Sequence, residues 1–192
     1  MQNQRRPFSG KSDSGMSLVE LLVYLGLLLV VVVILSGLLI NLLNVQNRVV
    51  NAASASQQAQ LIAQTLETGV RNATAIKLEQ VSSTEQMVTL RSAQSASNLS
   101  WVCMAFYFNA ANGGSVRYQR SPSAIAIPSA GQLGQWTLLG QGISASPQGN
   151  LFTLVGTRLS FNFASRVQNS PSTVINSQIS ARGGALVSAP CF

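Results

Sequence analysis

The sequence predicts an α+β protein, in which one long N-terminal helix is followed by an antiparallel β-sheet. Three observations support this class. An uncharged apolar run extends from Leu21 to Ile40, and no proline occurs between Pro7 and Pro122. After Gln80 the spacing of apolar residues changes from the helical period to a period of two, which is typical of strands. A helix followed by short-looped strands indicates an α+β layout.

The first half of the predicted helix, residues 16–43, is apolar on all sides. A helix of twenty residues rises about 30 Å, which is enough to cross the hydrocarbon core of a membrane. The residues before it include Arg5, Arg6 and Lys11, and no comparable basic excess follows it. This asymmetry predicts a single membrane span with the N-terminus inside and the C-terminal part outside.

The second half of the predicted helix, residues 44–80, is amphipathic. Its apolar positions follow an alternation of four and three, and the opposite face is rich in Gln and Arg. A narrow stripe of this kind suits packing against a sheet or another helix. The helix is expected to end near Leu78. The stripe consists of Val45, Val49, Ala52, Ser56, Ala59, Ala63, Leu66, Val70 and Ala73, widened by Ile62 and Ile76.

Residues 81–192 are predicted to form the sheet. The strongest strand is Leu99–Phe108, whose alternate residues are apolar on both faces, so we expect it to be central and covered on both sides. The sequence Asn112-Gly113-Gly114 predicts a turn into a partner strand. The other predicted strands are Met87–Arg91, Ser115–Gln119, Gln135–Leu139, Leu151–Val155, Arg158–Phe163 and Thr173–Ala181.

The two cysteines, Cys103 and Cys191, both follow the apolar segment. If the C-terminal part lies outside the membrane, it is in an oxidising compartment, where a pair of cysteines usually forms a disulfide. Two buried free thiols are the alternative. A bridge closing so long a loop is expected to stabilise the fold by roughly 4 kcal/mol.

Catalysis is not expected from this composition. The chain has no histidine, and its one aspartate, Asp13, precedes the helix. A Ser-His-Asp or Cys-His arrangement cannot be built without histidine. Clustered ligands for zinc or calcium are also missing from the sequence. We therefore expect no enzyme activity, no cofactor and no metal.

The chain carries an excess of positive charge, which is compatible with an anionic partner. The net charge of the chain is +7, and such an excess suits DNA or lipid head groups, although it is more often solvated surface charge. Arg117, Tyr118 and Arg120 lie close together in one predicted strand. Cations beside an aromatic ring are typical of contacts with single-stranded nucleic acid. A solvated strand face is the alternative reading of these three residues.

The segment Gly15-Met16-Ser17-Leu18-Val19-Glu20, preceded by a basic leader and followed by the apolar run, resembles the class III signal of prepilins. This superfamily comprises type IV pilins and the pseudopilins of type II secretion, and the length of the chain is closest to minor pilins and J-type minor pseudopilins. The family's commonest first mature residue is phenylalanine, and Met16 departs from it.

The resemblance implies a leader, residues 1–15, that a prepilin peptidase removes after Gly15 while methylating the new amine of Met16. Glu20 would pair with that amine of a neighbouring subunit during filament assembly. It also implies the pilin fold, other pilin or pseudopilin subunits as partners, and passage from the cytoplasmic membrane to a periplasmic or extracellular filament. Two alternatives remain: a filament-tip binding module, such as a DNA receptor or adhesin, and a single-pass surface protein that never assembles.

Overall fold

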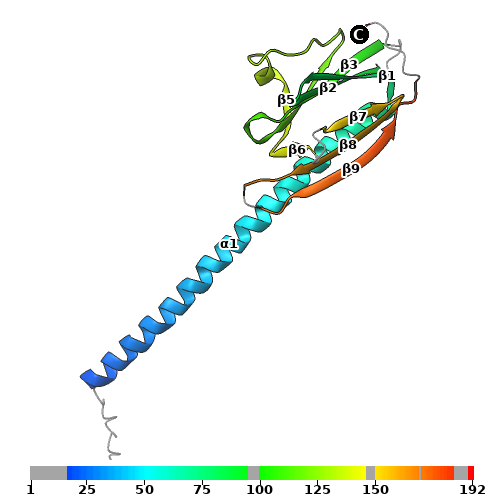
Figure 1. Ribbon diagram of the computed structural model, residues 1–192. Coiled ribbons are helices and arrows are strands. Elements are labelled where there is room, and N and C mark those ends of the chain that lie inside the picture. Colours follow the sequence, from blue (N-terminus) through cyan, green and yellow to red (C-terminus); the bar gives the residue numbers. More distant parts are fainter. Residues whose placement is uncertain (1–16, 95–99, 146–149, 169, 184–189) are drawn as a thin grey trace, which may run out of the picture. The chain divides into compact units, whose positions relative to one another are not determined.

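The computed structural model describes residues 17–94, 100–145, 150–168, 170–183 and 190–192. In these ranges one helix, α1 (Leu18–Arg71), precedes strands arranged in two antiparallel sheets (Figure 1). The predicted α+β class is confirmed. The chain divides into two compact units, residues 1–46 and residues 47–192, so the second half of α1 belongs to the same unit as the sheets.

The first sheet has five strands in the order β1-β2-β3-β4-β5. Strand β3 is its middle strand, as its two apolar faces predict. A short 3₁₀ turn, η1 (Ala111–Gly113), joins β3 to β4, and a second, η2 (Leu133–Gln135), precedes β5. The strands are β1 (Ala73–Ser82), β2 (Glu85–Gln94), β3 (Ser100–Asn109), β4 (Ser115–Ser121) and β5 (Thr137–Gln141).

The second sheet is built around β8. Strand β9 pairs with the whole length of β8, and β6 and β7 pair with its two ends. All of these pairings are antiparallel. The sequence did not predict the short strand β6. The strands are β6 (Ile143–Ala145), β7 (Phe152–Val155), β8 (Arg158–Ser165) and β9 (Thr173–Ser180).

The prediction that the helix reaches residue 80 is wrong, because α1 ends at Arg71. The next residues form β1, which pairs with β2 through a two-residue loop between Ser82 and Glu85. The apolar residues Ala73 and Ile76 are three positions apart, a spacing that fits a helical stripe. In β1 a bulge or irregularity between Ala73 and Ala75 brings both residues to the inner face of the sheet. Pairing with β2 decides between helix and strand, which is a tertiary effect that overrides local propensity.

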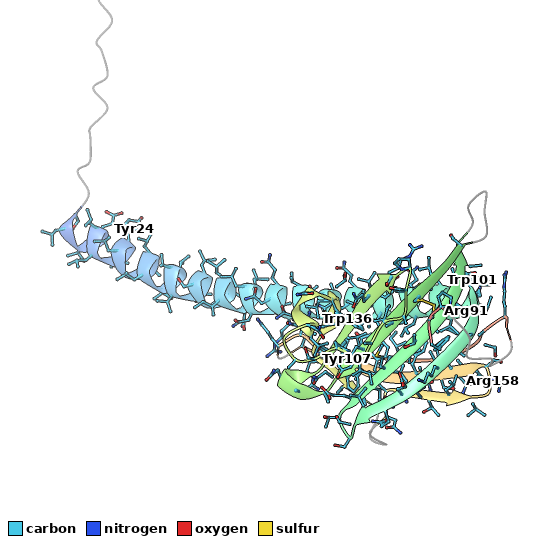
Figure 2. The ribbon with its side chains drawn as sticks, turned by 90° about the horizontal axis from the view of Figure 1, so that it is seen from above. Tyr24, Arg91, Trp101, Tyr107, Trp136 and Arg158 are labelled. Carbon is cyan, nitrogen blue, oxygen red and sulfur yellow. A yellow bond between two sulfur atoms is a disulfide. The ribbon has the colours of Figure 1, made fainter. Side chains whose placement is uncertain are left out.

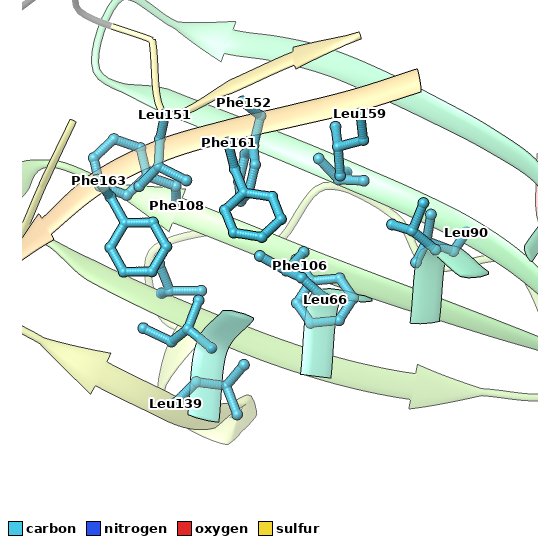
Figure 3. Packing of buried hydrophobic residues seen from close by; sticks show 14 of the residues in the cluster. Leu66, Leu90, Phe106, Phe108, Leu139, Leu151, Phe152, Leu159, Phe161 and Phe163 are labelled. Carbon is cyan, nitrogen blue, oxygen red and sulfur yellow. The ribbon is translucent and has the colours of Figure 1, made fainter. Parts of the chain in front are cut away.

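The core lies where the second half of α1 meets both sheets. The buried residues of α1 include Ala59, Ile62 and Leu66, which pack with the inner face of the first sheet and with β7 and β8. Figure 3 shows Phe106, Phe161 and the neighbouring rings of this cluster. The inner face of the first sheet is the face toward this cluster, and it carries Val88, Leu90, Phe106, Phe108 and Val116.

The buried side chain of Gln86 connects the two sheets. Its carboxamide oxygen accepts hydrogen bonds from the backbone N–H groups of Leu151 and Phe152, at 2.8 and 2.9 Å. Its amide nitrogen donates to the carbonyl of Phe152 at 3.1 Å and to the side chain of Gln80 at 2.9 Å. The carboxamide therefore satisfies backbone groups of β7 in the way that a neighbouring strand would.

The outer face of the first sheet is also covered. Met87, Ala105 and Tyr107 form a second small cluster there with Trp136, which precedes β5. Cys103 lies on this face in β3 and forms a disulfide with Cys191, with an S–S distance of 2.01 Å. The predicted disulfide is therefore present, and it fastens the end of the chain to the central strand.

Candidate functional site

In the first half of α1 the apolar side chains are exposed and pack against no other part of the described chain. Its large apolar side chains between Leu18 and Leu43 are 49–77% exposed. Full burial of one such side chain is worth about 1.5–3 kcal/mol, so leaving more than twenty of them in water forgoes tens of kcal/mol. Among the described residues, α1 is the one helix long and apolar enough to cross a membrane. By length and composition this segment could span a bilayer.

Glu20 is the one acidic residue in the first turn of α1, and its side chain is exposed. The positive end of the helix dipole favours a carboxylate at this position. In general, a charge within a hydrocarbon region costs a few kcal/mol unless a group of opposite charge pairs with it. Gly15 and Met16, the predicted processing residues, lie outside the described residues.

The structure separates the three predicted contact residues of β4. Alternate residues of a strand face opposite sides of the sheet. Arg117 lies opposite Tyr107 on the outer face, and its guanidinium donates to the carbonyl of Trp136 at 3.2 Å. Tyr118 lies opposite Phe106 on the inner face, with the two ring centroids 5.1 Å apart. Arg117 therefore does not form one patch with Tyr118 and Arg120.

Tyr118 and Arg120 line a groove of about 610 Å³ between the C-terminal end of α1 and the first sheet. The other walls include Thr65, Thr68 and Met104. Burial raises the pKa of Tyr118, while the nearby positive charge of Arg120 opposes that rise. The phenol of Tyr118 is thus neutral at neutral pH and can donate a hydrogen bond to a ligand.

A cation–aromatic pair that the sequence analysis did not identify lies on the outer face. The guanidinium carbon of Arg91 is 4.4 Å from the ring centroid of Trp101, and Figure 2 shows the two side chains together. The Nε group of Arg91 also donates to Thr74 Oγ1 at 3.1 Å. Arg91 and Trp101 lie on neighbouring antiparallel strands, two residues out of direct register, so their side chains share one face of the sheet. Only the register of β2 and β3 could reveal this pair.

The second small cluster contains a strongly perturbed phenol. Tyr107 is 2% exposed, and burial together with the neighbouring carboxylate of Glu85 raises its pKa to about 12. Glu85 also accepts a hydrogen bond from Asn109 at 2.6 Å. These contacts hold Tyr107 neutral, so its role is to pack and donate a hydrogen bond.

No group of three or more His, Cys, Asp or Glu side chains that could hold a metal occurs in the described ranges. The features with a potential function are therefore the uncovered apolar helix with Glu20, and the grooves of the sheet unit. No family model, curated protein or solved structure matches this chain.

Proposed function

We propose that this chain is a minor pilin or pseudopilin, a structural subunit of a type IV pilus-like filament. The observation that carries the proposal is the uncovered apolar half of α1, which begins with one carboxylate at Glu20. The apolar side chains of such a helix can be removed from water by a membrane or by a bundle of similar helices. The segment Gly15–Glu20, which resembles a prepilin signal, favours the second destination after processing.

In this proposal the subunit is first held in the membrane by α1 and is then extracted into the filament. Cleavage after Gly15 creates an ammonium group on Met16, one helical turn before Glu20. Pairing between Glu20 of one subunit and Met16 of the next would offset the cost of each charge in an apolar environment. The sheet unit, closed by its own core and by the Cys103–Cys191 disulfide, would face outward.

The first experiment is N-terminal sequencing and intact mass measurement of the membrane-extracted chain, with and without a co-expressed prepilin peptidase. The expected product begins at N-methylated Met16. A chain that begins at Met1 in both cases would refute the prepilin class and leave a non-assembling single-pass protein.

The assembly role of Glu20 is tested by Glu20→Ala. We expect this variant to insert in the membrane and to fail to enter filaments, because the incoming amine loses its partner. Glu79→Ala is the matched control, since it removes a partly exposed carboxylate from β1 in the sheet unit. Normal filament entry of Glu20→Ala would disprove the pairing mechanism.

The groove beside Tyr118 and Arg120 favours a second function, that of a binding module presented by the filament. A cation and an aromatic ring on one wall suit single-stranded DNA. We expect Arg120→Glu to abolish DNA binding and to leave filaments intact. Arg117→Glu, on the opposite face of the same strand, is the control; equal effects of both variants would show that the groove is not the site.

A further inference from the structure

A second pocket lies at the N-terminal end of the packed half of α1. Its volume is about 580 Å³. One wall is α1 and the other is the connection from β8 to β9. The residues that line it are Arg48, Val49 and Ala52 on the helix, and Arg166, Ser170 and Pro171 on the connection.

One side-chain hydrogen bond joins the two walls, and contacts with Gly142 fix the position of the connection. The side chain of Asn51 in α1 donates to the side-chain oxygen of Gln168 at 3.0 Å. The N–H of Arg166 donates to the carbonyl of Gly142 at 2.9 Å. Gly142 has φ +70°, and a Cβ at this position would lie 1.9 Å from the carbonyl oxygen of Arg166. Ser170 is 4% exposed. Hydrogen bonds and close packing therefore fix the shape of this pocket.

The charged residues that line the pocket are both basic. Arg48 and Arg166 are both exposed, and no carboxylate lines the pocket. In the described part of the chain neither arginine belongs to a salt bridge. The nearest acidic residue along α1 is Glu67, about 28 Å away at the helical rise, and Glu79 and Glu85 lie in β1 and β2. Two unopposed guanidinium groups therefore favour an anion here.

The position of the pocket in the chain suggests where that anion comes from. Arg48 follows Leu43, the end of the apolar segment, by only five positions. Five residues span about 7.5 Å in a helix and at most about 18 Å in an extended chain. Whatever the orientation of the two units, Arg48 stays near the head groups when residues 16–43 cross the membrane.

We propose that this pocket binds the headgroup of an anionic phospholipid. Guanidinium groups bind phosphate through paired, charge-assisted hydrogen bonds. Val49, Ala52 and Pro171 offer an apolar surface to the glycerol and the first acyl carbons. A zwitterionic lipid is disfavoured because its ammonium group meets the same two cations. The inference rests on the membrane anchor in the proposed function, and it does not require filament assembly.

Native mass spectrometry of the full chain in neutral detergent tests the proposal, with phosphatidylglycerol and phosphatidylcholine as probes. The test variant is Arg48→Gln with Arg166→Gln. The control, Arg158→Gln with Arg182→Gln, removes the same charge from exposed positions elsewhere in the sheet unit. We expect phosphatidylglycerol adducts of the test variant to fall by at least about tenfold, with the control unchanged. Circular dichroism checks that both variants fold.

Equal loss in both variants, or no loss in the test variant, would overturn the proposal. Displacement of the lipid by millimolar inorganic phosphate would also overturn it, since the pocket would then recognise phosphate alone. Flotation of the native chain with phosphatidylcholine vesicles tests the anchor separately. A chain that floats and shows no lipid selectivity refutes the pocket alone, whereas a chain that does not float refutes the anchor.

Discussion

Gln86→Leu tests whether the contact between the two sheets depends on one carboxamide. Leucine nearly preserves the volume of glutamine, so the change removes hydrogen bonds without leaving a large cavity. Gln86 is 2% exposed and bonds to the backbone N–H groups of Leu151 and Phe152. The leucine variant leaves both donors buried and without this acceptor.

The expected cost follows from these contacts. A buried donor that loses its partner costs about 1–3 kcal/mol, so two donors cost about 2–6 kcal/mol. Burial of the leucine side chain returns about 1.5–3 kcal/mol. The carbonyl of Phe152 also loses a donor. With about 1–3 kcal/mol for that carbonyl, we expect the free energy of unfolding to fall by about 1.5–6 kcal/mol, a large share of the stability of a typical domain.

Guanidinium denaturation of the full chain in neutral detergent measures this loss. The fluorescence of Trp101 and Trp136 reports on unfolding, since both tryptophans belong to the unit that contains the sheets. Gln178→Leu makes the same chemical change at an exposed position of β9 and is expected to shift stability by less than about 0.5 kcal/mol. A loss below about 1 kcal/mol for Gln86→Leu, or an equal loss in the control, would refute the reasoning.

Three further predictions concern the same unit. Replacing Cys103 and Cys191 by serine should lower the free energy of unfolding by about 4–5 kcal/mol, because the bridge spans a separation of 88 residues; denaturation with and without reductant measures this. Tyr107 should ionise near pH 12 in the folded chain and near its ordinary pKa of 10.0 in the unfolded chain. Its contribution to stability should therefore be fully present below pH 10 and should fall between pH 10 and about pH 12, because the unfolded phenol loses its proton first. Titration of the 295 nm absorbance, compared with Tyr107→Phe, measures this. Gly142→Ala should destabilise the fold strongly because the new Cβ would meet a backbone carbonyl at 1.9 Å, whereas Gly131→Ala, with open space around it, should have little effect on the thermal midpoint.

Much of the fold was predictable from local pattern. The two apolar faces of residues 99–108 predicted a central strand, and β3 is the middle strand of its sheet. The turn after it was predicted from Asn112-Gly113-Gly114, where all three residues adopt positive φ. In each case the predicting pattern lies within one short segment, so the strand and the turn could be predicted without knowing which strands lie beside them.

The candidate sites were less predictable. The sequence placed Arg117, Tyr118 and Arg120 together, but the alternation of β4 puts Arg117 on the opposite face of the sheet. Arg91 and Trp101 lie on consecutive strands, and Arg48 and Arg166, which line one pocket, are far apart in the chain. No spacing rule predicts such pairs, because strand register and loop placement decide them.

The sequence by itself determined the uncovered apolar helix with Glu20 at its start, the α+β class and the presence of two cysteines beyond the apolar segment. These properties depend on composition and periodicity, which act within a single element. The tertiary structure decided where α1 ends, how Gln86 joins the sheets and which arginines share a pocket. Each of these depends on contacts between distant segments, whose free energy outweighs the local preference of the residues involved.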